Sequence, residues 1–140
     1  MGCFYFGNQF KNYVNARFKV GTTGEKTPAQ RLTKLRQEHT NFELMCYLPL
    51  IDDTKAEREA VEHHVKMMML RRFPELSHDG NDHFTFKTNK DEHKEKILDF
   101  AATVMAFAQD YCDEYDIKYG EIVCPNYKKC GVRNNKKKKI

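Results

Sequence analysis

Hydrophobic residues in the first half of the chain fall into short runs separated by polar, turn-forming stretches. Residues 3–7 and 17–22 are rich in aromatic and β-branched residues, and each run reaches a glycine. This composition predicts two β-strands. The stretch between them is rich in asparagine, as hairpin loops often are, and favours an antiparallel pair. A third run, residues 42–50, is mostly apolar and predicts a buried strand.

Three stretches carry the spacing or the end signals of helices. Thr27 can cap a helix and Pro28 suits the first helical position, so a basic helix is expected over residues 27–39. A second helix follows a cap at residues 52–54, and a third, long helix begins at about residue 89. The expected core stripe of the second helix is Val61, His64, Val65 and Met68. The expected apolar face of the third is Ile97, Phe100, Ala101, Val104, Phe107 and Ala108.

The order of these elements, with a short strand-like return at "HFTF", is β–β–α–β–α–(β)–α. It predicts an α+β fold in which a small three-stranded antiparallel sheet is flanked by helices. The chain of 140 residues is long enough for a single modest core. We expect one domain over residues 1–120, with a motif-bearing core at 3–86 and a C-terminal helix at 89–115. Residues 121–140 read as a flexible basic tail.

The net charge of +4 is unevenly distributed along the chain. Residues 1–40 hold seven Lys or Arg and two Glu, a net charge of +5. Residues 128–140 hold seven Lys or Arg and no acid, a net charge of +7. The remaining middle, residues 41–127, therefore carries a net charge of −8. This distribution favours a local phosphate site plus a basic arm over a uniformly basic coat, although a solubilising tail explains the end equally simply.

Hydrophobic patterning and cysteine usage indicate an intracellular protein without membrane contact. No apolar run approaches the ~20 residues that a membrane-spanning helix needs. The start of the chain lacks the basic and long apolar regions of a signal peptide. The five cysteines are odd in number and widely scattered, so reduced thiols are the simpler expectation.

The first quarter of the chain combines an aromatic strand, a glycine-ended strand and an arginine-bearing helix. The centre of "CFYFG" is Tyr5, "FKVGTT" holds Lys19 and Gly21, and "PAQRLTKLR" holds Arg31. In this order and spacing the motifs resemble the GIY-YIG nuclease superfamily, especially its phage and large-DNA-virus branch. Tyr5 then matches the tyrosine of the first motif. Lys19 stands in the place of the tyrosine of the second motif, and Arg31 matches the arginine of the motif helix.

Further along, "EAVEHHV" resembles the Glu-x-x-x-His helix of the same superfamily. The resemblance implies that Glu59 binds the metal ion and that His63 is its catalytic partner. The residue before His63 is Glu62, where this branch usually has an apolar residue, so the register of the helix is fixed only to within a residue or two. The resemblance covers residues 3–86, because "NDHFTF" corresponds to the closing aromatic strand.

The resemblance implies a metal-dependent endonuclease that hydrolyses phosphodiester bonds of DNA. One Mg²⁺ (or Mn²⁺) held by a single carboxylate and water suits a hard cation that contacts phosphate directly. Arg31 offers a planar fork to two phosphate oxygens. Tyr5 can position or deprotonate the attacking water if its neighbours lower a pKa that is normally about 10. Lys19 can contact phosphate or, when desolvated, act as a base.

Each candidate residue also has a purely structural interpretation. Tyr5 stands between two phenylalanines and can simply pack in a core. Arg31 belongs to a basic helix of the kind that often forms a solvated face. Glu59 and His63 are four residues apart and share a helix face opposite Val61, where exposed pairs are common.

Basic side chains outside the motifs provide candidate contacts to the DNA backbone, which weaken as salt rises. The expected nucleic-acid-binding residues are Lys34, Arg36, Lys136, Lys137, Lys138 and Lys139. The four terminal lysines also suit a nuclear-import signal or a solubilising end.

Two other functions stay open at this point. One is a non-catalytic DNA-binding module that keeps the scaffold and the basic residues. The other is a protein-interaction factor that uses the acidic middle and the methionine-rich residues 67–70. Glu59 discriminates between the nuclease and these alternatives, since a nuclease needs its carboxylate and a binding module does not.

Overall fold

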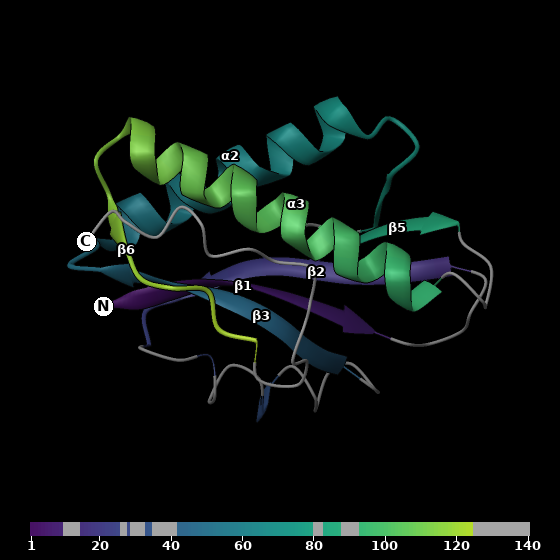
Figure 1. Cartoon of the computed structure of the whole chain (residues 1–140), viewed down its shortest axis with the longest axis horizontal. Helices are drawn as coiled ribbons and strands as arrows, with labels where there is room; N and C mark the ends of the chain where they lie inside the picture. Colours follow the sequence, from purple (N-terminus) through teal and green to yellow (C-terminus); the bar gives the residue numbers. More distant parts are fainter. Residues whose placement is uncertain are drawn as a thin grey trace.

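The computed structural model describes residues 1–9, 15–25, 28, 33–34, 42–79, 83–87 and 93–124. Its elements are β1 (Gly2–Gln9), β2 (Asn15–Thr23), β3 (Phe42–Ile51), α2 (Lys55–Arg72), β4 (Ser77–Asp79), β5 (His83–Lys87), α3 (His93–Glu114) and β6 (Lys118–Tyr119). Figure 1 shows α2 and α3 side by side over one face of a single sheet. The predicted α+β class is confirmed. The helix expected over residues 27–39 falls largely outside the described residues. Within this range, residues 33–34 are described as helical.

The described sheet has six strands in the order β4-β5-β2-β1-β3-β6, and every neighbouring pair is antiparallel. The predicted hairpin of β1 and β2 is present, and β1 lies at the centre between β2 and β3. The prediction of a three-stranded sheet is wrong. The strands that pattern analysis missed, β4 and β6, have three and two residues, too few to show the alternation on which such analysis depends.

Alternating side chains give the sheet two chemically different faces. Phe4 and Phe6 of β1 belong to the large core beneath α2 and α3, and we call this side the helix face. Tyr5, between them, points to the opposite face and packs there with Leu44 and Tyr47. Successive strand residues alternate sides, so each strand contributes to both surfaces.

An aromatic cluster joins the helix face of the sheet to the helices. The rings of Phe6 and Phe18 stack with centroids 5.2 Å apart, and Phe100 of α3 meets Phe18 edge-on at 4.7 Å. Phe73, at the end of α2, packs edge-on against Phe100 at 4.9 Å. Edge-to-face and offset contacts at these distances are the favoured aromatic geometries. The cluster therefore fixes both helices to the same pair of strands.

Helix α2 begins with the capping box that the sequence indicates. Thr54 accepts from the backbone of Glu57, and the Glu57 side chain accepts from the backbone of Thr54. Its buried residues are Val61, Val65 and Met69, whereas His64 and Met68 of the expected core stripe are only half-buried. The predicted apolar face of α3 is buried as expected. Neither of these two described helices is long and apolar enough to cross a membrane.

The chain continues along the sheet after α3, beyond the expected end of the domain at residue 120. Tyr119 of β6 donates a hydrogen bond to Asp113 at 2.9 Å, and Ile122 is buried in the core. Val123 forms a bridge with Tyr47 of β3. Residues 121–124, which were expected to begin the flexible tail, therefore belong to the packed fold.

The cysteines only partly follow the expectation of reduced thiols. Cys3, Cys46 and Cys112 are buried free thiols, whereas Cys124 is disulfide-bonded. Burial raises the pKa of Cys3 and of Cys112 to about 12. These two thiols are therefore protonated at neutral pH and act as small apolar core residues.

Asn8 is an exception in the core and generates a stability prediction. It pairs in register with Phe18, is fully buried, and among the described residues neither side-chain amide atom finds a hydrogen-bond partner. A buried amide without partners loses its hydration and gains nothing in return. We expect Asn8→Leu to leave the free energy of unfolding unchanged or to raise it by about 1 kcal/mol. Urea unfolding measures this.

Asn8→Asp is the matched control, because it keeps the size of the side chain and adds a charge. It should lower the free energy of unfolding by more than 2 kcal/mol or so, since an unpaired charge is costly to bury. A clear loss of stability in Asn8→Leu would show that the amide does have partners in solution.

Candidate functional site

Two of the sequence-predicted residues, Tyr5 and Lys19, come together on the face of the sheet away from the helices. In the β1–β2 ladder Tyr5 pairs with Gly21, and Gly7 pairs with Lys19. Tyr5 and Lys19 are 1% and 3% exposed, so both are almost completely buried. A lysine at this depth needs compensating partners, and Lys19 does make further interactions.

The ring of Tyr5 lies directly against Gly21. A Cβ atom added to Gly21 would be 2.6 Å from the Tyr5 hydroxyl oxygen and 2.8 Å from the ring carbon that bears it. The missing side chain therefore makes room for the tyrosine, which crosses from the central strand over β2. This contact brings the hydroxyl of Tyr5 to the outer part of β2.

The second half of β2 runs past the end of its outer neighbour. Strand β5 pairs with β2 only over Asn15–Lys19, so among the described strands none pairs with the outer side of residues 20–23. We call residues 20–23 the β2 edge. Unpaired strand edges present backbone donors and acceptors to a ligand. The hydroxyl of Tyr5 and these backbone groups therefore share one border of the sheet.

On the helix face of the β2 edge, Thr22 contacts a carboxylate of α2. The Thr22 hydroxyl donates to Glu62 Oε1 at 3.1 Å, and Lys66 Nζ lies 2.6 Å from Glu62 Oε2. The side chains of Glu62 and Lys66 are 21% and 18% exposed. Glu62 is thus a half-buried carboxylate that is held between a strand hydroxyl and an ammonium group.

The structure does not bring Glu59 and His63 to this position. Both are exposed on α2. Relative to the buried Val61, they lie about 160° and 200° around the helix, whereas Glu62 lies at only about 100°. The signal that identifies Glu62 is its place in "VEHHV", immediately beside the core residues Val61 and Val65. An acid at the border of a core stripe faces the element on which the helix packs.

One turn nearer the start of α2, a second ion pair ties the helix to the sheet. Arg58 Nη1 lies 2.8 Å from Asp53 Oδ2, and the backbone N–H of Gly2 donates to Asp53 Oδ1 at 3.0 Å. The side chain of Asp53 is fully buried. Burial alone would raise the pKa of this carboxyl, but the hydrogen bond and charge of Arg58 outweigh burial and hold the pKa below its ordinary value.

Arg58, Glu62 and Lys66 follow one another at intervals of four residues and form one line on α2 beside β2. A Cβ atom added to Gly24, just beyond the β2 edge, would lie 3.1 Å from Arg58 Nη2. The line therefore runs along the β2 edge and into the following turn. It alternates in charge as positive, negative and positive.

The donor set fits a cation that keeps most of its water. The described residues contain no group of three or more His, Cys, Asp or Glu side chains that would enclose a metal ion. A single carboxylate beside the β2 edge is enough for Mg²⁺, which often binds through one or two carboxylates, water and a phosphate oxygen. Glu62 has this character, and the competing group at its Oε2 atom is Lys66.

Of the remaining sequence-predicted site residues, only Lys34 lies within the described part of the chain. Lys34 is exposed in a helical position. Arg31, Arg36, Lys136, Lys137, Lys138 and Lys139 lie outside the described residues.

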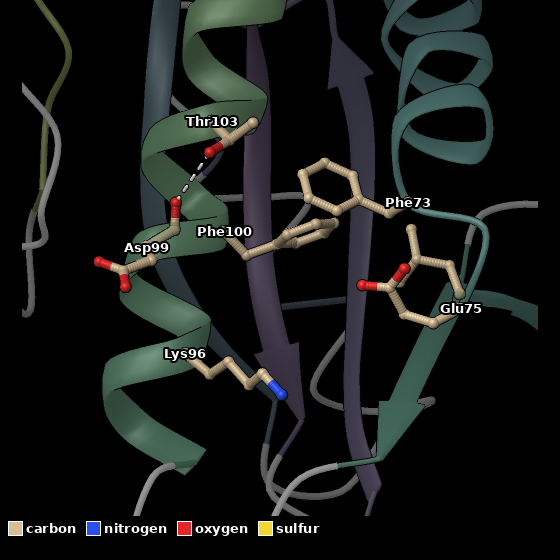
Figure 2. Close-up of a pocket in the computed structure, with 7 residues that line it drawn as sticks. Phe73, Glu75, Lys96, Asp99, Phe100 and Thr103 are labelled. Atoms are coloured by element: carbon tan, nitrogen blue, oxygen red, sulfur yellow. Dashed lines mark hydrogen bonds between the residues drawn. The ribbon is translucent and has the colours of Figure 1, made fainter.

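A separate pocket of about 160 Å³ lies where the end of α2 meets the first half of α3. Figure 2 shows the rings of Phe73 and Phe100 next to each other, in the edge-on contact described above, with Glu75 and Lys96 among the residues that line the pocket. The floor of this pocket is aromatic. It is therefore poorly suited to phosphate or metal chemistry, unlike the polar border along the β2 edge.

No protein-family model, curated protein or solved structure matches the chain. What the β2 edge does is therefore inferred from the chemistry of Tyr5, Lys19, Thr22 and Glu62 and from their arrangement.

The contact between Tyr5 and Gly21 predicts a specific sensitivity to a methyl group. In Gly21→Ala the new Cβ would overlap a buried ring that has little room to move, so we expect a loss of about 1–3 kcal/mol in the free energy of unfolding. Gly120→Ala is the control, because a Cβ there would meet Pro49 at an ordinary 3.6 Å. Urea unfolding of both variants measures the difference. Equal stability of the two would mean that the tyrosine does not rest on Gly21.

The ion pair of Asp53 and Arg58 predicts an acid-dependent part of the stability. Because the pKa of Asp53 is lowered by folding, its contribution is present above its unfolded pKa of about 3.9 and is lost as the pH falls through the folded value. Asp53→Asn should lower the free energy of unfolding by about 3 kcal/mol near neutral pH. The loss should shrink in acid, as the pH falls below about 3.9 and through the lowered pKa of the folded state, because the wild-type carboxyl then becomes protonated too.

Urea unfolding at both pH values checks this dependence, with the exposed Glu121→Gln as a control for the loss of one carboxylate. A loss of the same size at both pH values would mean that the hydrogen-bond geometry, and not the charge of Asp53, stabilises the fold.

Proposed function

We propose that the protein is a metal-dependent endonuclease that hydrolyses DNA phosphodiester bonds at the β2 edge. The observation that carries the proposal is the half-buried Glu62, which accepts from Thr22 one residue after Gly21, the residue against which Tyr5 rests. The carboxylate of Glu62 lies on the helix face of the β2 edge, and the phenol of Tyr5 lies on the opposite face of the same edge. The resemblance of the motifs to the GIY-YIG superfamily supports the same activity, and the α+β architecture is compatible with it.

In this proposal Glu62 replaces Glu59 as the carboxylate that binds Mg²⁺ or Mn²⁺. Glu62 faces the strand that carries Lys19 and Gly21, whereas Glu59 faces away from the sheet. The shift of three residues exceeds the one or two residues of uncertainty that the unusual "VEHHV" sequence left for the helix register. Thr22 orients the carboxylate by donating to one of its oxygens, and the other oxygen, which Lys66 contacts, is the one that would bind the cation.

Hydrolysis of a phosphodiester bond at the β2 edge requires three chemical events. Water attacks phosphorus, its proton passes to a base, and the bond from phosphorus to the leaving oxygen breaks as that oxygen gains a proton. The bound metal ion supplies charge stabilisation for the phosphate oxygens. Tyr5 and Lys19 lie on the opposite face of the sheet from Glu62 and are almost completely buried, so in this proposal they support the β2 edge from that face and do not contact the substrate. Arg31, by its resemblance to the motif arginine, would hold a further phosphate oxygen.

A non-catalytic DNA-binding module is the second candidate, and one observation favours it. Lys66 already neutralises Glu62, so the carboxylate has a cationic partner without any metal ion. A module of this kind would bind DNA through Lys34 and the basic tail, with affinity falling as salt rises, and would cleave nothing.

A protein-interaction factor is the third candidate. Met67 and Leu70, three residues apart on the outer side of α2, are 45% and 41% exposed, and a partner protein could cover them. Such a factor would keep its partner after removal of the basic tail and would have no affinity for nucleic acid.

Cleavage of supercoiled plasmid and of branched DNA in the presence of Mg²⁺, Mn²⁺ or EDTA tests the proposed function. We expect metal-dependent nicking by the wild type and a loss of about 100-fold or more in Glu62→Gln, because the metal and its charge stabilisation are lost. Glu59→Gln, an equal change on the same helix, should stay within about threefold of the wild type, since its side chain faces solvent. Circular dichroism and thermal unfolding confirm that the variants are folded.

The opposite result, with Glu59→Gln inactive and Glu62→Gln active, would return the metal role to Glu59. Binding of DNA without cleavage by the wild type would establish the non-catalytic module. Cleavage that survives both substitutions would come from another site or another protein, and the proposal would be abandoned.

A further inference from the structure

The contact between Lys66 and Glu62 bears directly on when the proposed site can hold a metal ion. Lys66 Nζ is 2.6 Å from Glu62 Oε2, and the hydroxyl of Thr22 is 3.1 Å from Oε1. Both carboxylate oxygens therefore have a donor. The two side chains are about four-fifths buried, so solvent screens their attraction less than it would at an open surface. The order Glu then Lys at an interval of four residues is also the favourable one in a helix.

A divalent cation and the ammonium group of Lys66 cannot both bind the Oε2 atom of Glu62. Mg²⁺ binds oxygen at about 2.0–2.1 Å and demands an octahedral shell of further oxygens. An ammonium at hydrogen-bond distance from the same atom would intrude on that shell and repel the ion. Binding of the metal therefore requires that Lys66 leaves Oε2.

Lys66, which also has an interaction besides that with Glu62, is more easily displaced from Glu62 than Arg58 is from Asp53. Arg58 is bound to the fully buried Asp53, which also accepts from the Gly2 backbone, so moving Arg58 would strand a buried charge. Lys66 sits on a flexible four-carbon stem that retains access to solvent, and an ammonium group is a compact point charge that phosphate attracts well. A phosphate at the β2 edge would compete with Glu62 for it.

We propose that Lys66 is an internal counter-ion of the proposed metal site, which it keeps closed to Mg²⁺ until a DNA phosphate draws its ammonium away from Glu62. The inference rests on the proposed function, because it takes Glu62 as the metal carboxylate. It goes further by assigning Lys66 two alternating partners. Metal ion and DNA then bind cooperatively, since each favours the state in which Lys66 has moved.

By thermodynamic linkage the cooperation is reciprocal: DNA raises the affinity for the metal by the same factor by which the metal raises the affinity for DNA. A carboxylate that is always accessible would show no such coupling beyond the attraction between metal and phosphate. The role of Lys66 is therefore measurable without any cleavage assay.

The experiment is a titration of Mn²⁺, followed by the electron paramagnetic resonance of the free ion, with and without a short phosphorothioate DNA duplex. The proteins are the wild type, Lys66→Met, Glu62→Gln and Lys55→Met. Lys55 is an exposed lysine on the same helix, so Lys55→Met controls for the loss of one positive charge. Thermal unfolding of each protein controls for folding, and Lys66→Gln serves as a second neutral variant.

Without DNA we expect Lys66→Met and Lys66→Gln to bind Mn²⁺ about tenfold more tightly than the wild type and Lys55→Met, within the usual range of coupling between sites. With DNA the affinity of the wild type should rise by a similar factor, and that of the Lys66 variants by clearly less. Glu62→Gln should lose the binding in every condition.

The two proposals fail in different ways. If Glu62→Gln weakens the binding of Mn²⁺ but Lys66→Met binds it as the wild type does, the counter-ion role is wrong and the proposed metal site stands. If Glu62→Gln binds Mn²⁺ as the wild type does, Glu62 is not the metal carboxylate and both proposals fall.

Discussion

The burial of Val61, Val65 and Met69 sets the rotation of α2 about its own axis, and that rotation decides which polar residues face strand β2. Each step of one residue turns a helix by about 100°, so the stripe leaves little freedom for its neighbours. Glu62 falls on the flank that borders the sheet, whereas Glu59 falls on the side facing solvent. The position of Glu62 in the candidate site therefore follows from how the buried stripe of α2 packs on the sheet. A shift of the stripe by one residue would replace the carboxylate that meets Thr22.

Local patterns predict the parts of the fold that local chemistry determines. The hairpin of β1 and β2, the cap at Thr54 and the buried face of α3 all follow from residues close to one another in the sequence. The strands β4 and β6 do not, because so few residues carry no periodicity. Of the candidate site, Tyr5 and Lys19 were placed correctly on neighbouring strands, but the burial of Lys19 depends on packing that the sequence does not display.

The difference between Glu59, which the motif indicates, and Glu62, which faces β2, has a similar origin. A motif comparison counts residues along one helix and is indifferent to which strand lies opposite. The partner of Glu62 is Thr22, forty residues away, and only the tertiary fold joins them. The sequence nevertheless contained a hint, since Glu62 stands between the core residues Val61 and Val65, where an acid must find a partner at the border or pay for its burial.

The two ion pairs beside β2 differ in what holds them, and this difference separates structure from proposed function. Asp53 is enclosed, bonded to a backbone N–H as well as to Arg58, so its charge is committed to the fold. Glu62 is held by one hydroxyl and by an ammonium on a flexible stem, so its charge can change partners. The nuclease would differ from the binding module in that a metal ion can take the place of Lys66 once phosphate has drawn it away.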